Sequence, residues 1–519
     1  MEMKESHTCC CTGRNLVKAG RSTSFPRNTP TTAHWCDVGQ VTIDMLPDLA
    51  LLEIFDFYTA AAQASDPTYN RETWIALVHV CRKWRDIVFA SPRRLNLRLL
   101  VTPMRSLRTM LDTWPPLLID IWGFKFGILG MVTIIAALEH DDRIRQIELI
   151  NSLSFCMEQV LAAMRKPFPE LIDLTLKFFH DGMSRITYPV IPDSFLGESA
   201  PRLQSLRLIR IPFPVPALQK LFLSAAGLVK IHIWKFPDSW YISPEEMVIC
   251  LSTLIRLEEL GLGFESPRNL GGRRRPPSAR CVLPSLTSLR FKGVYEYMEE
   301  LMARIDAPQL DNLKLFLFYQ QELDTPELAQ FVGRTPRFKA LNESHVLFDQ
   351  RGIFVSLPLT LRRGIQFGLI GGPPGQLSSL VKLCTLSFLR TLIPIVKHLY
   401  ILENRSPLLY NLLDGIDSDD NQWLELLHLF TAVKDLYLSK GFAPYIAPAL
   451  HGSVGEGTTE VLPALLNIFL ERLPSPGPFE EKTFRPFVAA RQLFSHHHQI
   501  AISYWDGEFD EWLEREDAF

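Results

Sequence analysis

One pattern of apolar residues recurs along most of this chain: an apolar residue, any two residues, a second apolar residue, any one residue, and a third. The copies are Ile144, Ile147, Leu149; Leu171, Leu174, Leu176; Leu203, Leu206, Leu208; Leu228, Ile231, Ile233; Leu257, Leu260, Leu262; Leu286, Leu289, Phe291; Leu310, Leu313, Leu315; Val396, Leu399, Ile401; Val433, Leu436, Leu438; and Leu465, Ile468, Leu470. The middle residues of the first seven copies lie 27, 32, 25, 29, 29 and 24 residues apart. This order predicts one short strand per copy and a stack of similar units.

The spacing is at or slightly above the roughly 20–29 residues of leucine-rich repeats. Most copies lack the asparagine of standard repeats, so they are expected to be degenerate. Prolines stand two residues before several strands' first leucine, at Pro169, Pro201, Pro284 and Pro308. Proline there favours an extended entry and ends the preceding helix. We therefore predict an α/β fold: an irregular leucine-rich-repeat-like solenoid over residues 96–475.

Short strands followed by helices also describe a doubly wound α/β sheet, which is the alternative. Ten copies in one order with short links favour the solenoid. The pattern is irregular between residues 335 and 395. Phe338 and Leu341 fit one copy there, and the glycine- and proline-rich residues 371–375 interrupt the next.

The composition bounds the class of protein. The 519 residues are 47% hydrophobic and 21% charged, with a formal net charge of −3, so neither nucleic acid nor an anionic membrane is expected as a partner. Nine cysteines without regular spacing fit a reducing compartment, so we expect an intracellular, cytoplasmic or nuclear protein. The longest apolar run, residues 126–138, is shorter than the ~20 residues of a membrane helix and predicts a buried helix. Residues 1–40 are expected to be a disordered tail, and residues 476–519 a C-terminal cap or tail.

Residues 41–95 carry a different pattern. Pro47 is suited to the first turn of a helix, and Asp48 is favourable near its N-terminus. A second apolar face has helical spacing up to the helix-stopping Pro92, and its residues are Trp74, Leu77, Val78, Cys81, Trp84 and Val88. An ordinary amphipathic helical pair explains this spacing. It does not explain the opening Leu46-Pro47 together with the run Val80-Cys81-Arg82-Lys83-Trp84.

These residues, in this order, resemble an F-box, and the passage from His79 to Leu95 is similar to the fungal F-box proteins of mushroom-forming species. Such proteins carry a degenerate leucine-rich array after the F-box. The resemblance implies a small helical bundle that binds a Skp-type adaptor and, through it, a cullin–RING ubiquitin ligase. The residues carried over as adaptor-binding or as bundle core are Leu46, Pro47, Leu49, Leu52, Ile54, Phe55, Val80, Cys81, Trp84, Ile87 and Val88. The stretch from Thr59 to Asn70 is longer than in the compact motif.

A second surface is expected on the solenoid strands. Side chains alternate along a strand, so the residues between the inward leucines should line the concave face. This flanking row is basic first and aromatic later, and it reads Arg207, His232, Gly261, Arg290, Lys314, Tyr400, Tyr437 and Phe469. Such a row suits an acidic or mixed protein substrate.

No group of residues predicts catalysis, a metal site or a cofactor. Residues 368–375 are glycine-rich but lack the Gly-Lys-Ser/Thr end of a phosphate loop. The triplet His496–His498, the basic Arg273–Arg275, and the group Asp417, Asp419 and Asp420 lack the spacing of known sites. We therefore expect a non-catalytic substrate receptor of a cullin–RING ligase. The alternatives are an F-box scaffold without ligation and an unrecognised α/β hydrolase-like enzyme.

Overall fold

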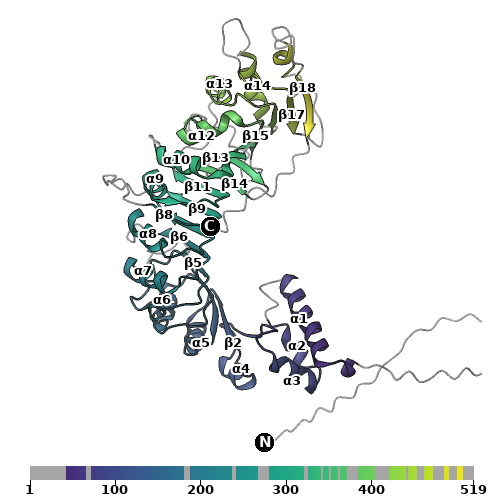
Figure 1. The fold of residues 1–519 in the computed structure, drawn as a ribbon, viewed down its shortest axis with the longest axis vertical. Helices are drawn as coiled ribbons and strands as arrows, with labels where there is room; N and C mark the ends of the chain where they lie inside the picture. Colours follow the sequence, from purple (N-terminus) through teal and green to yellow (C-terminus); the bar gives the residue numbers. More distant parts are fainter. Residues whose placement is uncertain are drawn as a thin grey trace, which may run out of the picture.

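The chain forms a curved array of strands and helices with a small helical bundle beside its N-terminal end (Figure 1). The structure is a computed structural model. It describes residues 43–65, 72–179, 188–236, 241–266, 280–320, 325–340, 343–349, 352–360, 363–370, 381, 384–403, 420–439, 442–452, 461–471, 484–489 and 500–505. The strands line the inner, concave side of the array, and the helices that connect them lie on the outer, convex side.

The bundle contains a short 3-10 turn, η1 (Ile43–Met45), and three helices, α1 (Asp48–Ser65), α2 (Trp74–Val78) and α3 (Arg82–Ala90). The Pro47 carbonyl accepts the first helical hydrogen bond of α1 from Leu51 N at 3.1 Å, as expected for proline at a helix start. The expected single helix from Trp74 to Pro92 is wrong, because Cys81 is extended (φ −156°, ψ 172°) and separates α2 from α3. Arg85 Nε donates to the Val78 carbonyl at 3.0 Å and closes this break.

Each repeat contributes one strand to a 16-stranded sheet. Its parallel strands up to the irregular region are β1 (Arg98–Val101), β2 (Leu118–Phe124), β3 (Ile144–Asn151), β4 (Asp173–Phe178), β5 (Ser205–Ile209), β6 (Lys230–Phe236), β7 (Glu259–Phe264), β9 (Ser288–Gly293) and β11 (Asn312–Phe318). Beyond it follow β15 (His398–Glu403), β16 (Asp435–Leu438), β17 (Asn467–Glu471) and β18 (Ala501–Trp505). A separate pair of short strands, β8 (Cys281–Val282) and β10 (Ile305–Asp306), lies outside this sheet.

The connecting helices pack against one another along the convex side. They are α4 (Leu107–Thr113), α5 (Ile128–Leu138), α6 (Ser154–Ala163), η2 (Phe195–Glu198), α7 (Val215–Ser224), α8 (Pro244–Leu251), α9 (Tyr295–Arg304), α10 (Pro326–Arg334), η4 (Pro336–Ala340), α12 (Ser387–Leu392), η5 (Ile393–Ile395), α13 (Asp420–His428) and α14 (Ala443–Gly452). Because the described helices cover one face of the sheet, the doubly wound alternative is wrong. The fold is a leucine-rich-repeat-like α/β solenoid.

The apolar triplet has a consistent structural role. Its second and third residues are the strand residues that face the helices. Its first residue is buried just before the strand, except in the first copy, where Ile144 is the first residue of β3. Just before the strand, one backbone carbonyl accepts two hydrogen bonds from the next repeat and so joins neighbouring repeats. Val229 O, for example, accepts hydrogen bonds from both Glu258 N (2.8 Å) and Glu259 N (3.0 Å) of the next repeat. All ten predicted triplets coincide with strands, from β3 to β17.

The irregular region holds three strands, β12 (Glu343–Asp349), β13 (Gly352–Thr360) and β14 (Arg363–Ile370). The sheet order there is β11-β14-β13-β12-β15. After β11 the chain first forms β12, three positions away in the sheet, and β13 and β14 then occupy the two positions between them in reverse order. β14 pairs parallel with β11 and β12 pairs parallel with β15, while β13 runs antiparallel between them. An insertion of three strands therefore replaces the regular repeats expected there, and the solenoid continues on its far side.

The bundle is joined to the first repeat through the free edge of β1. The Trp74 indole Nε1 donates to Arg98 O at 3.0 Å, and Leu100 N donates to the Glu72 carboxylate at 3.0 Å. Trp74 also packs edge-on against Trp114, with ring centroids 5.1 Å apart. The side chains before and at the start of α2 thus satisfy polar backbone groups of an edge strand that would otherwise invite pairing with another chain.

Two further expectations need correction. The helix expected to be buried, α5, is buried on one side only, and its other side exposes Ile128, Leu129 and Val132. The sheet continues beyond the expected boundary at residue 475, since β18 pairs parallel with β17. Among the described residues no helix is long and apolar enough to cross a membrane. The segments outside the described residues include the expected tail 1–40, Arg273–Arg275, residues 371–375, Asp417, Asp419 and His496–His498.

Candidate protein-interaction surfaces

Helix α1 is apolar on both of its sides. One side faces α2 and α3, where Leu51 and Phe55 are fully buried. On the other side Leu49 is 70% exposed and Phe57 is 78% exposed, and Ile54 and Tyr58 are also exposed. The outer side of α1 is therefore an exposed surface rich in apolar side chains.

The expected adaptor-binding residues fall into three groups by exposure. The exposed ones are Pro47, Leu49, Ile54 and Val80. The half-buried ones are Leu46, Cys81 and Trp84. The buried ones are Leu52, Phe55, Ile87 and Val88. These last four belong to the core of the bundle, which is one of the two roles expected for the set. Phe55, for instance, packs against Trp84 with ring centroids 4.7 Å apart.

Polar contacts hold the start of α1 beside the start of α3. Lys83 Nζ donates to the Leu46 carbonyl at 3.1 Å and lies 3.6 Å from the Asp48 carboxylate. Arg94 pairs with Glu53 of α1. The turn that carries the exposed Val80 is therefore fixed close to the exposed start of α1. Sequence reasoning missed Phe57, Tyr58, Ile43 and Met45 as exposed apolar residues of this bundle, although helical spacing from Leu49 and Ile54 could have indicated the first two.

The second expected surface is continuous in the structure. Pairing across the sheet places Arg207 opposite His232, His232 opposite Gly261, and Gly261 opposite Arg290. Arg290 lies opposite Lys314, and on the far side Tyr400, Tyr437 and Phe469 follow one another. The two halves are joined through Gln366, Ser356 and His345, which belong to the irregular region and were not identified from the sequence. All predicted residues of the row thus lie in one register on the concave side.

The first half of this row is positively charged. Arg207, Arg290 and Lys314 are half-buried there, and Lys177 and Lys292 point to the same side one row further along. We call these five residues the basic strip. Each lies between residues that face the helices, so their cationic ends are directed to the concave side.

One acid–base pair borders the basic strip. His232 Nε2 lies 3.3 Å from Glu259 Oε2, and Lys230 Nζ donates to Glu259 Oε1 at 2.6 Å. The hydrogen bond from His232, with the contribution of Lys230, lowers the pKa of Glu259 to about 2. Burial lowers the pKa of His232, and the charges of Arg207 and Arg290 act in the same direction. The charge of Glu259 is therefore engaged locally.

The second half of the row is a stack of rings, which we call the aromatic stack. Its ring centroids are 4.4 Å apart between His345 and Tyr400, 4.1 Å between Tyr400 and Tyr437, and 4.4 Å between Tyr437 and Phe469. Trp505 of β18 packs edge-on against Tyr437 at 5.9 Å. Burial is the main cause that raises the pKa of Tyr400. The stack gives the concave face a rigid apolar platform edged by two phenol hydroxyls.

Glycines on the concave side make room for large rings. A Cβ on Gly263 would lie 1.9 Å from Trp234 Cε3, and one on Gly261 would lie 2.7 Å from the His232 ring. The Trp234 indole therefore lies across β7, where the row contains no side chain. This explains why the otherwise basic row is interrupted at Gly261.

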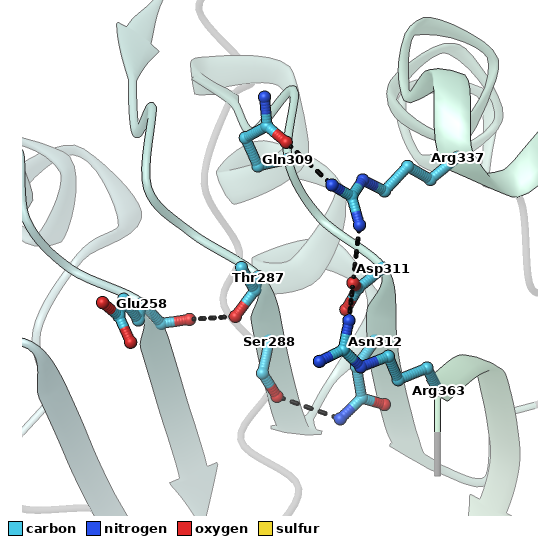
Figure 2. Close-up of polar contacts among 8 residues, drawn as sticks. All are labelled: Glu258, Thr287, Ser288, Gln309, Asp311, Asn312, Arg337 and Arg363. Carbon is cyan, nitrogen blue, oxygen red and sulfur yellow. Dashed lines mark hydrogen bonds and ion pairs between the residues drawn. The ribbon is translucent and has the colours of Figure 1, made fainter. Parts of the chain in front are cut away.

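A polar network at the beginnings of β9, β11 and β14 joins neighbouring repeats (Figure 2). The buried Asp311 carboxylate accepts from Arg337 at 2.9 Å and from Arg363 at 2.6 Å, and Arg337 also donates to Gln309 at 3.0 Å. Asn312 donates to Ser288 at 3.0 Å. These groups connect η4 to β11 and β14. We assign the network a structural role at the boundary of the irregular region.

Other buried acids also connect elements. The Glu299 carboxylate accepts from Glu327 N and Leu328 N, both at 2.9 Å, and so caps the N-terminus of α10. Asp120 of β2 accepts from Arg98 of β1 at 3.1 Å. In the part of the chain that the structure describes, no cluster of three or more His, Cys, Asp or Glu side chains could hold a metal ion.

Comparison with protein-family models finds no match, and comparison with curated proteins finds none either. Among solved structures, the chain is similar to the leucine-rich repeat-containing protein LegL7 from Legionella pneumophila, at 15% sequence identity. The likeness covers 75% of this chain and 97% of that one, with a TM-score of 0.26. The assignment of the fold is made on this chain's own strand order and repeat geometry.

Proposed function

We propose that the chain is a non-catalytic substrate receptor of a cullin–RING ubiquitin ligase. The bundle of α1–α3 binds a Skp-type adaptor, and the concave face of the solenoid binds a protein substrate. The observation that carries the proposal is the outer side of α1, where Leu49 and Phe57 are more than two-thirds exposed although the same helix buries Leu51 and Phe55.

The energetics favour a partner on this side. Burying a leucine or phenylalanine side chain stabilises by roughly 1.5–3 kcal/mol. In the isolated chain much of this stabilisation is not realised, because Leu49, Ile54 and Phe57 remain exposed to solvent. A groove on another protein that accepts an amphipathic helix would recover it, and helix-in-groove docking is a common recognition mode.

The sequence supports a particular kind of partner. The order Leu46-Pro47 at the entry to α1, then Val80-Cys81-Arg82-Lys83-Trp84 at the entry to α3, is the part of the chain that resembles an F-box. Pro47, Leu49 and Val80 from this pattern are exposed, and they lie where Lys83 joins the starts of α1 and α3. An F-box bundle would use this corner to contact a Skp-type adaptor.

The solenoid supports the receptor half of the proposal. The basic strip suits acidic segments of a substrate, and the aromatic stack offers rigid apolar anchors of the kind enriched at the centres of interfaces. The two surfaces are separate, since one lies on the bundle and the other on the inner side of the strands. A receptor needs both to be accessible at once.

The test is capture of a purified Skp-type adaptor by the full chain and by a Leu49→Asp, Phe57→Asp variant. We expect at least a hundredfold weaker capture, because hot-spot residues contribute ~2 kcal/mol or more each. The matched control is Leu129→Asp in α5, which changes a leucine that is 85% exposed and should leave capture unchanged.

The outcomes are distinct if all variants keep the circular dichroism and melting temperature of the parent chain. Equal capture by parent and double variant, or no capture by either, would overturn the adaptor assignment. Capture of the adaptor without recruitment of cullin, when purified cullin is added to the complex, would make the chain an F-box scaffold rather than a ligase subunit.

A further inference from the structure

The concave basic strip has a chemical counterpart within the same chain. Seven of the fourteen residues 506–519 are Asp or Glu, and one is Arg. This segment follows directly after β18, the last strand of the sheet. The strip that it complements contains Lys177, Arg207, Arg290, Lys292 and Lys314.

The starting point of the segment lies on the correct face. Trp505, the residue before it, packs edge-on against Tyr437 at 5.9 Å and Tyr400 at 6.3 Å. Both tyrosines belong to the concave row, so the Trp505 side chain, directly before the segment, lies on the side where the basic strip is displayed.

The segment is also long enough. β18 lies seven strand positions from β11 in the sheet order, which corresponds to about 34 Å at ~4.8 Å per strand. Fourteen extended residues span at most about 46–50 Å. Lys314 on β11 and then Arg290 and Lys292 on β9 are therefore within reach, and a path across the inside of a curved sheet is shorter still.

Glu259, which borders the strip, is itself paired with Lys230 and His232. Arg290 and Lys314 lie on adjacent strands in direct register, so their positive charges reinforce each other at one place. An anionic segment that spans several strands would interact with both at once.

We propose that residues 506–519 dock in cis on the basic strip as an internal acidic peptide. The docked segment covers the surface assigned above to substrates, so a substrate must present an acidic stretch that displaces it. This inference rests on the proposed use of the concave face for substrates. The docking itself can be tested without an adaptor or a ligase.

The first test is zero-length carbodiimide cross-linking of the full chain, which joins a lysine amine to a carboxylate in direct contact. Peptide mass spectrometry of the monomer band should find Lys292 or Lys314 joined to Asp or Glu residues of 506–519. Lys220 on the convex helix α7, which is exposed, is the internal control and should not be joined to this segment. Absence of links to Lys292 and Lys314, or links to Lys220 at a similar level, would overturn the proposal.

The second test measures competition with a fluorescent peptide of sequence 506–519. It compares the full chain with a full-length variant whose seven acidic residues in 506–519 are changed to Asn or Gln. The peptide should bind the neutralised variant at least tenfold more tightly, because its site is no longer occupied in cis. Adding Arg290→Glu and Lys314→Glu to that variant should reduce binding by at least tenfold, and raised salt should weaken it.

Equal peptide affinity for the parent and the neutralised chain would contradict docking in cis. So would a peptide affinity that is unchanged by Arg290→Glu and Lys314→Glu. Adaptor capture is measured in parallel and should not change with the charge of 506–519. Failure of the parent chain to capture the adaptor would count against the proposed function. The cross-links and the peptide competition report only on the docked segment.

Discussion

The bundle and the solenoid use similar apolar side chains in opposite ways. In the solenoid the two strand residues of each triplet, such as Leu289 and Phe291, are completely buried against the helices of the convex side. In the bundle, α1 buries Leu51 and Phe55 but leaves Leu49 and Phe57 in solvent. The inward strand residues of the solenoid are therefore covered within the chain, while α1 leaves apolar side chains exposed.

Helix α5 shows that exposure alone does not define a docking surface. It also presents apolar residues, Ile128, Leu129 and Val132, to solvent. The outer side of α1 differs because it adjoins a second exposed element, the turn at Val80, which Lys83 holds in place. Substitution of an exposed apolar residue on α5 is therefore the control for substitutions on the outer side of α1.

The largest effect is expected where the two regions meet. Trp74→Ala removes a buried indole, its hydrogen bond to Arg98 O and its contacts with Trp114 and Phe89. We expect a loss of about 3–5 kcal/mol in the free energy of unfolding, measured by urea denaturation. A loss below about 1 kcal/mol would mean that the bundle is not anchored to β1 through this residue.

A matched pair of leucine truncations tests the contrast directly. Leu289→Ala in β9 should lower the free energy of unfolding by about 2–5 kcal/mol, because this side chain is fully buried. Leu49→Ala in α1 should change it by no more than about 0.5 kcal/mol, as is usual at exposed positions. Urea titrations of both variants give the comparison, and similar losses in the two would contradict it.

The aromatic stack is expected to contribute less. Tyr437→Leu removes the stacked contacts to Tyr400 and Phe469 and the edge-on contact to Trp505, while it keeps an apolar side chain. Each such pair is worth ~0.5–1.5 kcal/mol, so a loss of at least about 1.5 kcal/mol is expected in thermal or urea unfolding. Tyr445→Leu on the convex helix α14 is the control for loss of a tyrosine outside the stack. Equal losses would show that stacking adds nothing.

The smallest effect is a dependence of stability on pH at the His232–Glu259 pair. The pKa of Glu259 is lowered to about 2 in the folded chain, so its contribution is present above its ordinary pKa of 4.5 and is lost as the pH falls toward 2. The pKa of His232 is also lowered, so folding is further disfavoured as the pH falls below 6.5.

Glu259→Gln should remove the part of the acid dependence between pH 4.5 and 2 and lower stability at pH 7 by about 1 kcal/mol or less, since the pair is partly exposed to solvent. Urea unfolding from pH 7 to pH 3 measures both. Parallel pH profiles for the parent and Glu259→Gln would exclude the pair as a source of acid sensitivity.

Much of the solenoid could be predicted from the sequence because each strand is specified locally. A triplet such as Leu257, Leu260 and Leu262 determines which residues face the helices, and the residue between the last two must then lie on the concave side. The strand order of the irregular region could not be predicted. The apolar alternation of β13 is the same whether it pairs parallel or antiparallel, so its neighbours are decided by long-range packing.

The bundle shows the opposite limit. The spacing of Leu49, Leu52, Ile54 and Phe55 indicates an apolar helix but does not say which side the rest of the protein covers. The break at Cys81 was also missed, because the apolar spacing from Trp74 to Val88 continues through it. Packing of α1 against α2 and α3 decides which side is covered, and the local sequence does not encode it.

Hydrogen–deuterium exchange of the full chain, with and without a purified Skp-type adaptor, tests the central claim most directly. We expect added protection in residues 43–58 and around Val80 to Lys83, and no change in the strands from β4 to β17. Protection confined to the concave strands, or an unchanged α1 in the presence of saturating adaptor, would contradict the division of the molecule into an adaptor-binding bundle and a substrate-binding solenoid.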